Sequence, residues 1–278
     1  MSGTLFVVAT PIGNLEDLSP RARQTLTDVD LIAAEDTRHT GRLLSHFSIK
    51  TPQFALHDHN EDQVVDGLIS DILEGKSVAL VSDAGTPLIS DPGYRLVATA
   101  HSRGIRVVPV AGASAATVAL SAAGLPTDRY CFEGFLPAKQ KARIDRLAEL
   151  RSETRTIVLY ESVHRIRACL ADLVDEFGES RKSFLGRELT KMHEQCVQAT
   201  LSELLRQLDD GTIVAKGEFV IIVTGTDEEP TSSLDIDRLL VELSDRLPGK
   251  EAAKIAAKVT GSKRNDLYDR ILALKGRK

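Results

Sequence analysis

The sequence predicts an α/β protein built from two α/β domains and a small C-terminal helical module. In the first half of the chain, short β-rich apolar runs alternate with segments of helical composition, which is typical of a parallel sheet with right-handed crossovers. The stretch Gly124–Asp128 (GLPTD) breaks this alternation, and a second series of strands and helices begins after it. The last part of the chain has helical composition only.

In the first domain, expected over 1–124, buried strands are indicated by apolar runs bounded by Gly, Pro, Asp or Ser. These runs are Leu5–Ala9, Leu31–Ala34, Val78–Ser82 and Ile105–Val110. Helices are expected between them, with Ser19-Pro20 and Asp91-Pro92 as helix starts. The expected helices are Pro20–Val29, Arg38–Phe47, Glu61–Gly75 and Tyr94–Arg103. The small-residue run Gly112–Gly124 fits a tightly packed helix.

The second domain, expected over 129–225, restarts the pattern. Its expected strands are Tyr130–Glu133, Thr156–Tyr160, Ser183–Glu188, Gln195–Thr200 and Glu218–Thr224, and its expected helices are Ala138–Leu150 and His164–Phe177. Thr226–Ser233 (TDEEPTSS) has the composition of a polar linker. The expected helices beyond it are Asp235–Arg246, Lys250–Thr260 and Ser262–Ala273. Three short helices with a glycine turn before the last indicate a helix-turn-helix-like module over 235–276.

Composition excludes several classes of protein. No apolar run approaches the roughly 18 residues that cross a membrane, and the N-terminus has no secretory signal, so we expect a cytoplasmic location. Cys131, Cys169 and Cys196 lie far apart, which argues against a zinc site or a disulfide framework. Walker, GxGxxG and GxSxG motifs do not occur, so the sequence supports neither nucleotide binding of those types nor a nucleophile elbow.

Charge is unevenly distributed along the chain. Residues 250–278 contain nine lysines and arginines against three acidic residues, a net charge of +6. Since the whole chain carries −5, the remainder carries −11. A basic end on an acidic body suggests a polyanionic partner. Aromatic residues make up only 4% of the chain and Trp is absent, which disfavours RNA binding through many stacked bases.

Unusual loops follow two of the predicted strands. They are Thr10–Leu15 (TPIGNL) and Ser82–Gly93 (SDAGTPLISDPG). Open α/β sheets bind ligands beyond the carboxyl ends of their strands, where such loops lie. Gly85 and Gly93 would let backbone amides approach a ligand closely, and Asp83 would accept a hydrogen bond from a ribose or an amino group.

These polar segments also have structural explanations. We favour Asp91 as a helix cap rather than a ligand contact. After the second strand, Asp36 or Thr37 would serve as an N-cap and Arg38 would face solvent. Glu35 and Arg38 have no equally simple structural explanation at the rim of a site.

A metal site is the less favoured interpretation of a second polar cluster. His57 and His59 lie two residues apart, which suits two ligands on a strand, but no third ligand is evident. Asn60 fits a helix cap instead. We therefore expect no metal.

Eight segments of the sequence resemble one known family. They are VATPIGNLEDLSPRA (Val8–Ala22), AAEDTRHTGRLL (Ala33–Leu44), ALHDHNE (Ala55–Glu61), VSDAGTPLISDPG (Val81–Gly93), ALSAAGLPTDRYCFEGFLPAK (Ala119–Lys139), YESVHR (Tyr160–Arg165), GRELTKMHE (Gly186–Glu194) and KGEFVIIVTG (Lys216–Gly225). With these segments the chain resembles the bacterial small-subunit ribosomal RNA methyltransferase I family, an RNA branch of the tetrapyrrole methylase superfamily. The resemblance covers essentially the whole chain. Ala111–Ser114 (AGAS) departs from the Pro-Gly-Pro-Cys or Pro-Gly-Ala-Ser expected there.

The resemblance implies 2′-O-methylation of a cytidine ribose in the decoding region of 16S rRNA, with S-adenosylmethionine as the methyl donor. It also implies a tetrapyrrole-methylase-like body that binds the donor between its two domains, a homodimer, and the 30S subunit as partner. Donor contacts carried over by position are Pro11, Asp83, Ala84, Gly85, Leu88, Ile89, Ser114 and Ala115, with Tyr160, Leu189 and Lys216 placed by their motifs.

The group that accepts the proton of the ribose hydroxyl stays open. Because the sulfonium donor is already activated, alignment is the main task of the enzyme, and removal of that proton would help. The candidate bases are Glu35, Asp36, His57, Glu161 and Glu188. Each has an alternative role as a loop anchor. We prefer Asp36 as base or hydroxyl orienter and Arg38 as phosphate holder, with Glu35 as the third catalytic candidate.

Two basic segments are expected to bind RNA phosphates. One is the helix around Lys139, Lys141 and Arg143, and the other is the tail with Lys263 and Arg264. The alternative for each is a solvated helix face. Two rival functions are methylation of a tetrapyrrole such as a corrin precursor, in which a basic module has no evident role, and RNA binding without catalysis, which the elaborate strand-end loops disfavour.

Overall fold

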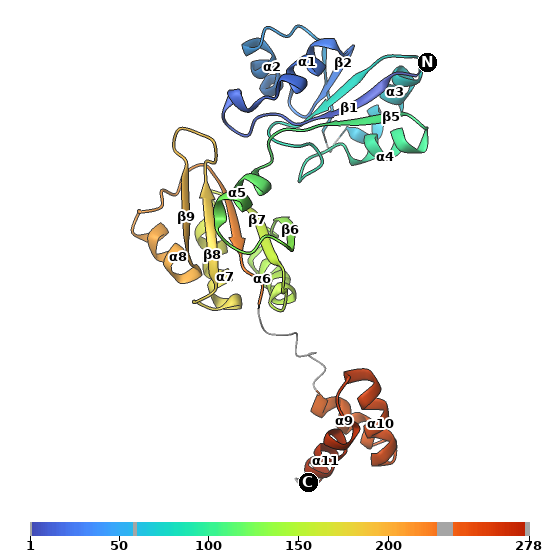
Figure 1. Ribbon diagram of the computed structural model, residues 1–278, viewed down its shortest axis with the longest axis vertical. Coiled ribbons are helices and arrows are strands. Elements are labelled where there is room, and N and C mark those ends of the chain that lie inside the picture. The colour runs from blue at the N-terminus through green and yellow to red at the C-terminus, as the bar shows by residue number, and fades with distance from the viewer. Residues whose placement is uncertain (1, 58–59, 227–235, 276–278) are drawn as a thin grey trace. The chain divides into compact units, whose positions relative to one another are not determined.

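In the computed structural model, the first half of the chain forms a five-stranded parallel sheet (Figure 1). The structure describes residues 2–57, 60–226 and 236–275. The strands are β1 (Thr4–Val8), β2 (Leu31–Ala34), β3 (Gln53–Ala55), β4 (Val78–Val81) and β5 (Arg106–Val110). Their order across the sheet is β3-β2-β4-β1-β5.

Helices cover both faces of this sheet. They are α1 (Pro20–Asp28), α2 (Thr37–His46), α3 (Glu61–Leu73) and α4 (Tyr94–Ser102), with a short 3-10 helix η1 (Leu15–Asp17) before α1. The buried side chains of α1 and α2 pack with Val81 on one face, and those of α3 and α4 pack with Leu80 on the other. The neighbouring strands β1 and β4 therefore lead to helices on opposite faces, which opens a crevice between the segments that follow them.

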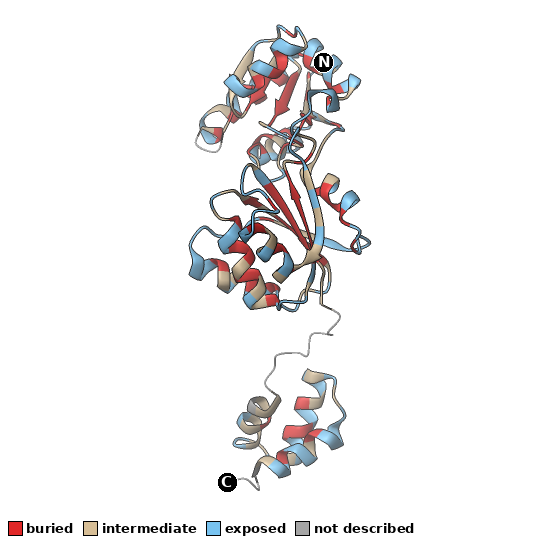
Figure 2. Cartoon of the chain, turned by 90° about the vertical axis from the view of Figure 1, so that its left-hand side faces the viewer, coloured by how far each residue is buried: buried red, intermediate tan, exposed pale blue. Residues whose placement is uncertain are grey.

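A second, mixed sheet follows in the chain. Its strands are β6 (Tyr130–Phe135), β7 (Thr156–Ser162), β8 (Lys182–Arg187), β9 (Gln195–Thr200) and β10 (Glu218–Val223), in the order β6-β7-β10-β8-β9. Only β6 and β7 pair in parallel. The helices α6 (Gln140–Leu150), α7 (Ile166–Phe177) and α8 (Leu201–Asp209) pack on one face. Buried residues gather in the strands and on the helix faces toward them (Figure 2).

The other face of the second sheet is covered by α5 (Ala115–Ala123). Its buried residues Ala116, Ala119 and Ala123 lie against Val220 and Ile222 of β10, so the small side chains allow a close approach. The tight packing predicted for this run is confirmed. The expected domain limits at 124 and 129 stay a prediction, because both sheets belong to one compact unit, Met1–Arg151 with Arg155–Gly225.

The second compact unit holds α9 (Ile236–Ser244), α10 (Gly249–Thr260) and α11 (Arg264–Lys275). Its own small core includes Leu240, Ala256 and Leu267. The predicted linker and the predicted helix start at Asp235 lie almost entirely outside the described residues, as does His59 of the metal hypothesis. In the part of the chain that the structure describes, no helix is long and apolar enough to cross a membrane.

One feature of the sequence was misinterpreted, and two elements were missed. Asp91 does not cap α4, because Gly93 is the N-cap residue and a carboxylate oxygen of Glu61 accepts hydrogen bonds from the amides of Arg95 (3.0 Å) and Leu96 (3.2 Å). The strand β3 and the helix α8 were not predicted.

The expected role of Arg143 in RNA binding is also wrong. Its side chain is only 4% exposed, and its guanidinium Nε donates to a carboxylate oxygen of Asp172 at 2.6 Å. Gln140 donates to the other oxygen of Asp172 at 3.1 Å. This ion pair ties α6 to α7 beneath the surface, so phosphates have no access to Arg143.

We expect the Arg143→Ala variant to lose about 3–5 kcal/mol of folding free energy, because it leaves the Asp172 carboxylate buried without its partner. Thermal unfolding measures this loss. The matched control is Arg167→Ala, which breaks the exposed pair with Asp209 and should barely move the melting temperature. Equal melting temperatures for the two variants would contradict the structural role of Arg143.

Candidate active site

A cavity of about 360 Å³ lies at the carboxyl ends of the first sheet's strands, and both sheets line it. The loop after β4 and the strands β7 and β10 supply most of the lining, with further residues from the segments after β1, β2 and β8, from the end of β6 and from the start of α5. Its lining residues are Ile12, Glu35, Asp83, Ala84, Gly85, Thr86, Ile89, Ser90, Asp91, Ser114, Ala115, Phe135, Tyr160, Glu161, Ser162, Gly186, Leu189, Lys191, Glu218, Phe219 and Val220. We call it the main cavity.

The loops after β1 and β4 are joined at this cavity. The amide of Thr10 donates to the carbonyl of Gly85 at 2.8 Å, and the amide of Gly85 donates to the carbonyl of Thr10 at 3.1 Å. Gly85 has φ of +86°, and a Cβ atom there would lie 3.3 Å from Ile12. A glycine is therefore needed where the two loops pair.

A reciprocal pair of hydrogen bonds also joins the segment after β2 to the loop after β4. A carboxylate oxygen of Glu35 accepts from the amide of Asp83 at 3.2 Å, and a carboxylate oxygen of Asp83 accepts from the amide of Asp36 at 3.0 Å. Both acidic side chains are thus oriented at the cavity wall. The segment after β2 can shift only if it breaks these contacts.

The second sheet contributes Tyr160, which lies at the N-terminus of α5. Its hydroxyl accepts a hydrogen bond from the amide of Ala116 at 3.1 Å. Its ring makes edge-on contacts with Phe132 and Phe135. Burial raises the pKa of Tyr160, and the nearby carboxylate of Asp91 adds to this effect, so the hydroxyl stays protonated at neutral pH.

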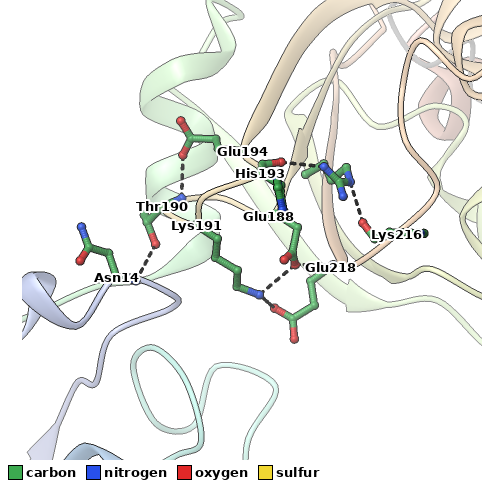
Figure 3. Close-up of polar contacts among 9 residues, drawn as sticks. Asn14, Glu188, Thr190, Lys191, His193, Glu194, Lys216 and Glu218 are labelled. Carbon is green, nitrogen blue, oxygen red and sulfur yellow. Dashed lines mark hydrogen bonds and ion pairs between the residues drawn. The ribbon is translucent and has the colours of Figure 1, made fainter. Parts of the chain in front are cut away.

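Lys191 reaches the cavity between two carboxylates (Figure 3). Its ammonium group lies 2.9 Å from a carboxylate oxygen of Glu188 and 2.9 Å from one of Glu218. Burial alone would raise the pKa of Glu188, but the hydrogen bonds from Lys191 and from the Glu218 amide outweigh burial and lower that pKa. The three side chains therefore form a charged triad, which we call the Lys191 triad.

The loop after β8 also contacts the loop after β1. The hydroxyl of Thr190 accepts from the amide of Asn14 at 3.3 Å (Figure 3). A Cβ atom on Gly13 would lie 2.3 Å from the Lys191 side chain. These contacts join the two sheets beside the cavity.

Backbone conformations of low intrinsic stability gather in these loops. Of the described non-glycine residues with positive φ, Leu88 and Ser90 lie in the loop after β4, and Glu188 and Thr190 lie in the loop after β8. Each costs about 1–3 kcal/mol and persists only where surrounding contacts hold it. Such residues concentrate at ligand sites, which supports a binding role for the main cavity.

A second hollow of about 370 Å³ adjoins the main cavity. It lies between the loop after β1, the first turns of α2 and the loop after β4. Its lining residues are Thr10, Pro11, Ile12, Gly13, Leu15, His39, Thr40, Arg42, Leu43, Ser82, Asp83, Ala84, Lys191 and Glu218.

The structure brings most of the predicted donor contacts together. Those that line the main cavity are Asp83, Ala84, Gly85, Ile89, Ser114, Ala115, Tyr160 and Leu189. Pro11 lines the second hollow, and Leu88 packs against the core beneath α3 and α4. Lys216 is exposed and lines neither space; its carbonyl accepts from the guanidinium of Arg187 at 2.6 Å, and its amide donates to the carbonyl of Val214 at 2.8 Å.

The preferred catalytic pair, Asp36 and Arg38, lines neither space. Asp36 is the N-cap of α2 and accepts from the Arg38 amide at 2.8 Å, while the Arg38 guanidinium pairs with its carboxylate at 2.7 Å. The side-chain hydrogen bond from Arg38 holds the pKa of Asp36 well below its usual range. Asp36 is thus a weak base, and the structure favours the alternative capping role over catalysis.

The remaining candidate bases differ in position. His57 lies outside both spaces, and the Lys191 triad engages Glu188. Glu161 lines the main cavity from β7, but its side chain is fully buried, and one of its oxygens accepts from Arg165 and from the Ser162 amide, which anchors the turn before α7. Glu35 is the candidate that lines the main cavity from the first sheet.

Some residues of the site were missed by sequence reasoning. Lys191 and Glu218 line both spaces, and Phe135 and Asp91 line the main cavity. Lys191 lies within the segment GRELTKMHE. The position of this segment at the end of a predicted strand was the signal that could have identified Lys191 as a residue of the site. Among the described residues, no group of three or more His, Cys, Asp or Glu side chains is arranged to hold a metal ion.

The predicted RNA contacts other than Arg143 are accessible. Lys139 and Lys141 are exposed at the start of α6, and Lys263 and Arg264 are exposed at the start of α11.

Comparison with known sequences shows which proteins the chain resembles. A family profile described as tetrapyrrole (corrin/porphyrin) methylases matches residues 4–205, and one described as the RsmI C-terminal HTH domain matches residues 230–275. A Xylella fastidiosa protein named ribosomal RNA small subunit methyltransferase I is 52% identical over 96% of this chain and 98% of its own length. A protein of the same name from Escherichia coli O157:H7 is 52% identical over 99% of this chain and 96% of its own.

Solved structures show the same fold at low sequence identity. A diphthine synthase superposes with a TM-score of 0.62 at 16% identity, covering 80% of this chain and 90% of that one. Uroporphyrin-III C-methyltransferase from Thermus thermophilus, complexed with S-adenosylhomocysteine, gives 0.53 at 16% identity, covering 79% and 97%.

Gly217 tests how the Lys191 triad is built. Its φ is +87°, and a Cβ atom there would lie 2.3 Å from the Glu188 carboxylate. We therefore expect Gly217→Ala to lower the free energy of unfolding in two ways. The backbone is strained by the new Cβ atom, and displacement of Glu188 costs about 1 kcal/mol more. Gly211→Ala is the matched control, because Gly211 has φ of +80° and open space around it. If Gly217→Ala and Gly211→Ala had equal melting temperatures, the close approach of Gly217 would not be what holds Glu188 in place.

Proposed function

Because the chain belongs to the ribosomal RNA small subunit methyltransferase I family of tetrapyrrole methylases, we propose that it methylates the 2′-oxygen of a cytidine ribose in the decoding region of 16S rRNA. S-adenosylmethionine is the methyl donor. The observation that carries the proposal is the main cavity at the switch point between β1 and β4, where the predicted donor contacts of both sheets meet. The solved uroporphyrin-III C-methyltransferase structures share only the fold with this chain.

The residues of the main cavity fit this donor. Its volume suits a small molecule, and Ile12 and Leu189 give it apolar walls. Glu35, Asp83 and Asp91 make it acidic, which suits a cationic ligand. When bound, S-adenosylmethionine supplies a methyl group already activated by its sulfonium. The protein then has to align the acceptor hydroxyl and remove its proton.

We assign the proton-accepting role to Glu35. The Asp83 amide orients its carboxylate at the wall of the main cavity, whereas Asp36 is committed to capping α2. Asp83, oriented in turn by the Asp36 amide, would hold a polar group of the donor.

Attraction of the RNA is assigned to exposed cations away from the cavity. The side chains that would contact phosphates are Lys139 and Lys141 at the start of α6 and Lys263 and Arg264 at the start of α11. Salt would therefore weaken the binding of RNA. The partner would be the 30S subunit, and the enzyme would act in the cytoplasm as a homodimer.

The deciding experiment incubates the protein with radiolabelled S-adenosylmethionine and 30S subunits from cells that lack this gene. We expect label on one ribose of 16S rRNA, located by mapping, and none on a precursor porphyrin. Label on the porphyrin alone would reverse the assignment. Calorimetry with S-adenosylhomocysteine tests donor binding separately.

We expect Glu35→Gln to lower the single-turnover rate of methylation by about 10²-fold or more, because the acceptor keeps its proton during attack. Rapid-quench assays at saturating donor measure this rate. Asp36→Asn is the control, since Asn also serves as an N-cap and should leave the rate unchanged. A lower rate for Asp36→Asn together with an unchanged rate for Glu35→Gln would assign the proton transfer to Asp36.

A further inference from the structure

The second hollow shares a wall with the main cavity. Ile12, Asp83, Ala84, Lys191 and Glu218 line both spaces. Methyl transfer requires the acceptor oxygen within about 3–3.5 Å of the methyl carbon. An acceptor nucleotide therefore has to lie directly beside the space that holds the donor, and the second hollow adjoins that space.

Thr40 lines the second hollow, and its side chain carries a buried polar atom that the protein leaves unsatisfied. The residue is only 2% exposed, and its hydroxyl has no hydrogen-bond partner among the described residues. Buried hydroxyl groups are normally hydrogen-bonded, because desolvation without a partner is costly. A hydroxyl left in this state beside a hollow points to a ligand that supplies the partner.

Basic side chains of the same helix also line the hollow. His39 and Arg42 are exposed at its edge, and neither forms an ion pair within the part of the chain that the structure describes. Of the carboxylates there, Asp83 accepts from the Asp36 amide and Glu218 pairs with Lys191. Arg42 therefore keeps its charge and its hydrogen-bond donors available, in contrast to Arg38, one turn earlier, which pairs with Asp36.

We propose that the second hollow receives the sugar–phosphate backbone of the target RNA strand at the nucleotide to be methylated. Arg42 and His39 hold a phosphate, and the Thr40 hydroxyl contacts a phosphate or ribose oxygen. The proposal rests on the proposed function and specifies its acceptor site. Arginine suits this task because its planar guanidinium binds two phosphate oxygens at once.

The test compares Arg42→Ala with Arg38→Ala in methylation of 30S subunits that lack the modification. Arg42→Ala should raise KM for the subunits about tenfold. In a plot of log KM against log salt concentration, the slope should be shallower by about one unit. The dissociation constant for S-adenosylhomocysteine should not change. Arg38→Ala removes the same charge from the same helix outside the hollow and should match the wild type.

Thr40→Val is the second variant. It keeps the shape of the side chain and removes only the hydroxyl, so the melting temperature should not fall, while KM for the subunits rises about fivefold. A lower melting temperature would mean that the hydroxyl has a structural role.

Three results separate the possible failures. Equal kinetics of the Arg42 and Arg38 variants, with an active wild type, would overturn the acceptor site and leave the proposed function standing. Loss of S-adenosylhomocysteine binding in Arg42→Ala would assign the second hollow to the donor. An inactive wild type would overturn the proposed function itself.

Discussion

The site depends on the pairing of Thr10 with Gly85, which joins the segments after β1 and β4 where the crossover connections leave for opposite faces of the sheet. Without these two backbone hydrogen bonds, the loops would be free to separate, since their polar and glycine-rich composition buries little apolar surface. The pairing sets Ile12 and Ala84 in the wall between the main cavity and the second hollow. The topology of the first sheet creates the crevice, and this contact gives the crevice a defined wall.

The second sheet also contacts these loops and helps to fix their positions. Besides the residues of β6, β7 and β10 that line the cavity, it supplies the loop after β8, where Glu188 and Thr190 adopt positive φ and Lys191 reaches across to the cavity wall. The cost of that backbone is offset by the hydrogen bonds of the Lys191 triad and by the contact of Thr190 with Asn14. The cavity therefore exists only where both sheets are folded, which is why neither sheet alone presents the site.

Sequence reasoning located the loops of the site because strand-end position and glycine content are local signals. The strand β3 was not predicted because three residues give no readable alternation. The helix α8 was not predicted either, although the Thr200–Glu203 capping box marks its start in the sequence. The roles of Asp91 and Arg143 could not be read locally, since the cap of α4 comes from Glu61 and the partner of Arg143 is Asp172. In both cases, the interaction that decides the role involves a residue that is distant in sequence.

The same reasoning explains why Arg42 rather than Arg38 faces the second hollow. The cap formed by Asp36 sets the start of α2, and the buried Leu43 and Leu44 fix which side of the helix meets the sheet. A helix advances about 100° per residue, so four residues return nearly to the same side, but the ion pair with Asp36 draws Arg38 toward the N-terminus. On a body with a large excess of acidic charge, RNA phosphates are repelled over most of the surface. In the proposed acceptor site, Arg42 beside the cavity would set the register of the strand, while the basic C-terminal segment would supply attraction that is independent of sequence.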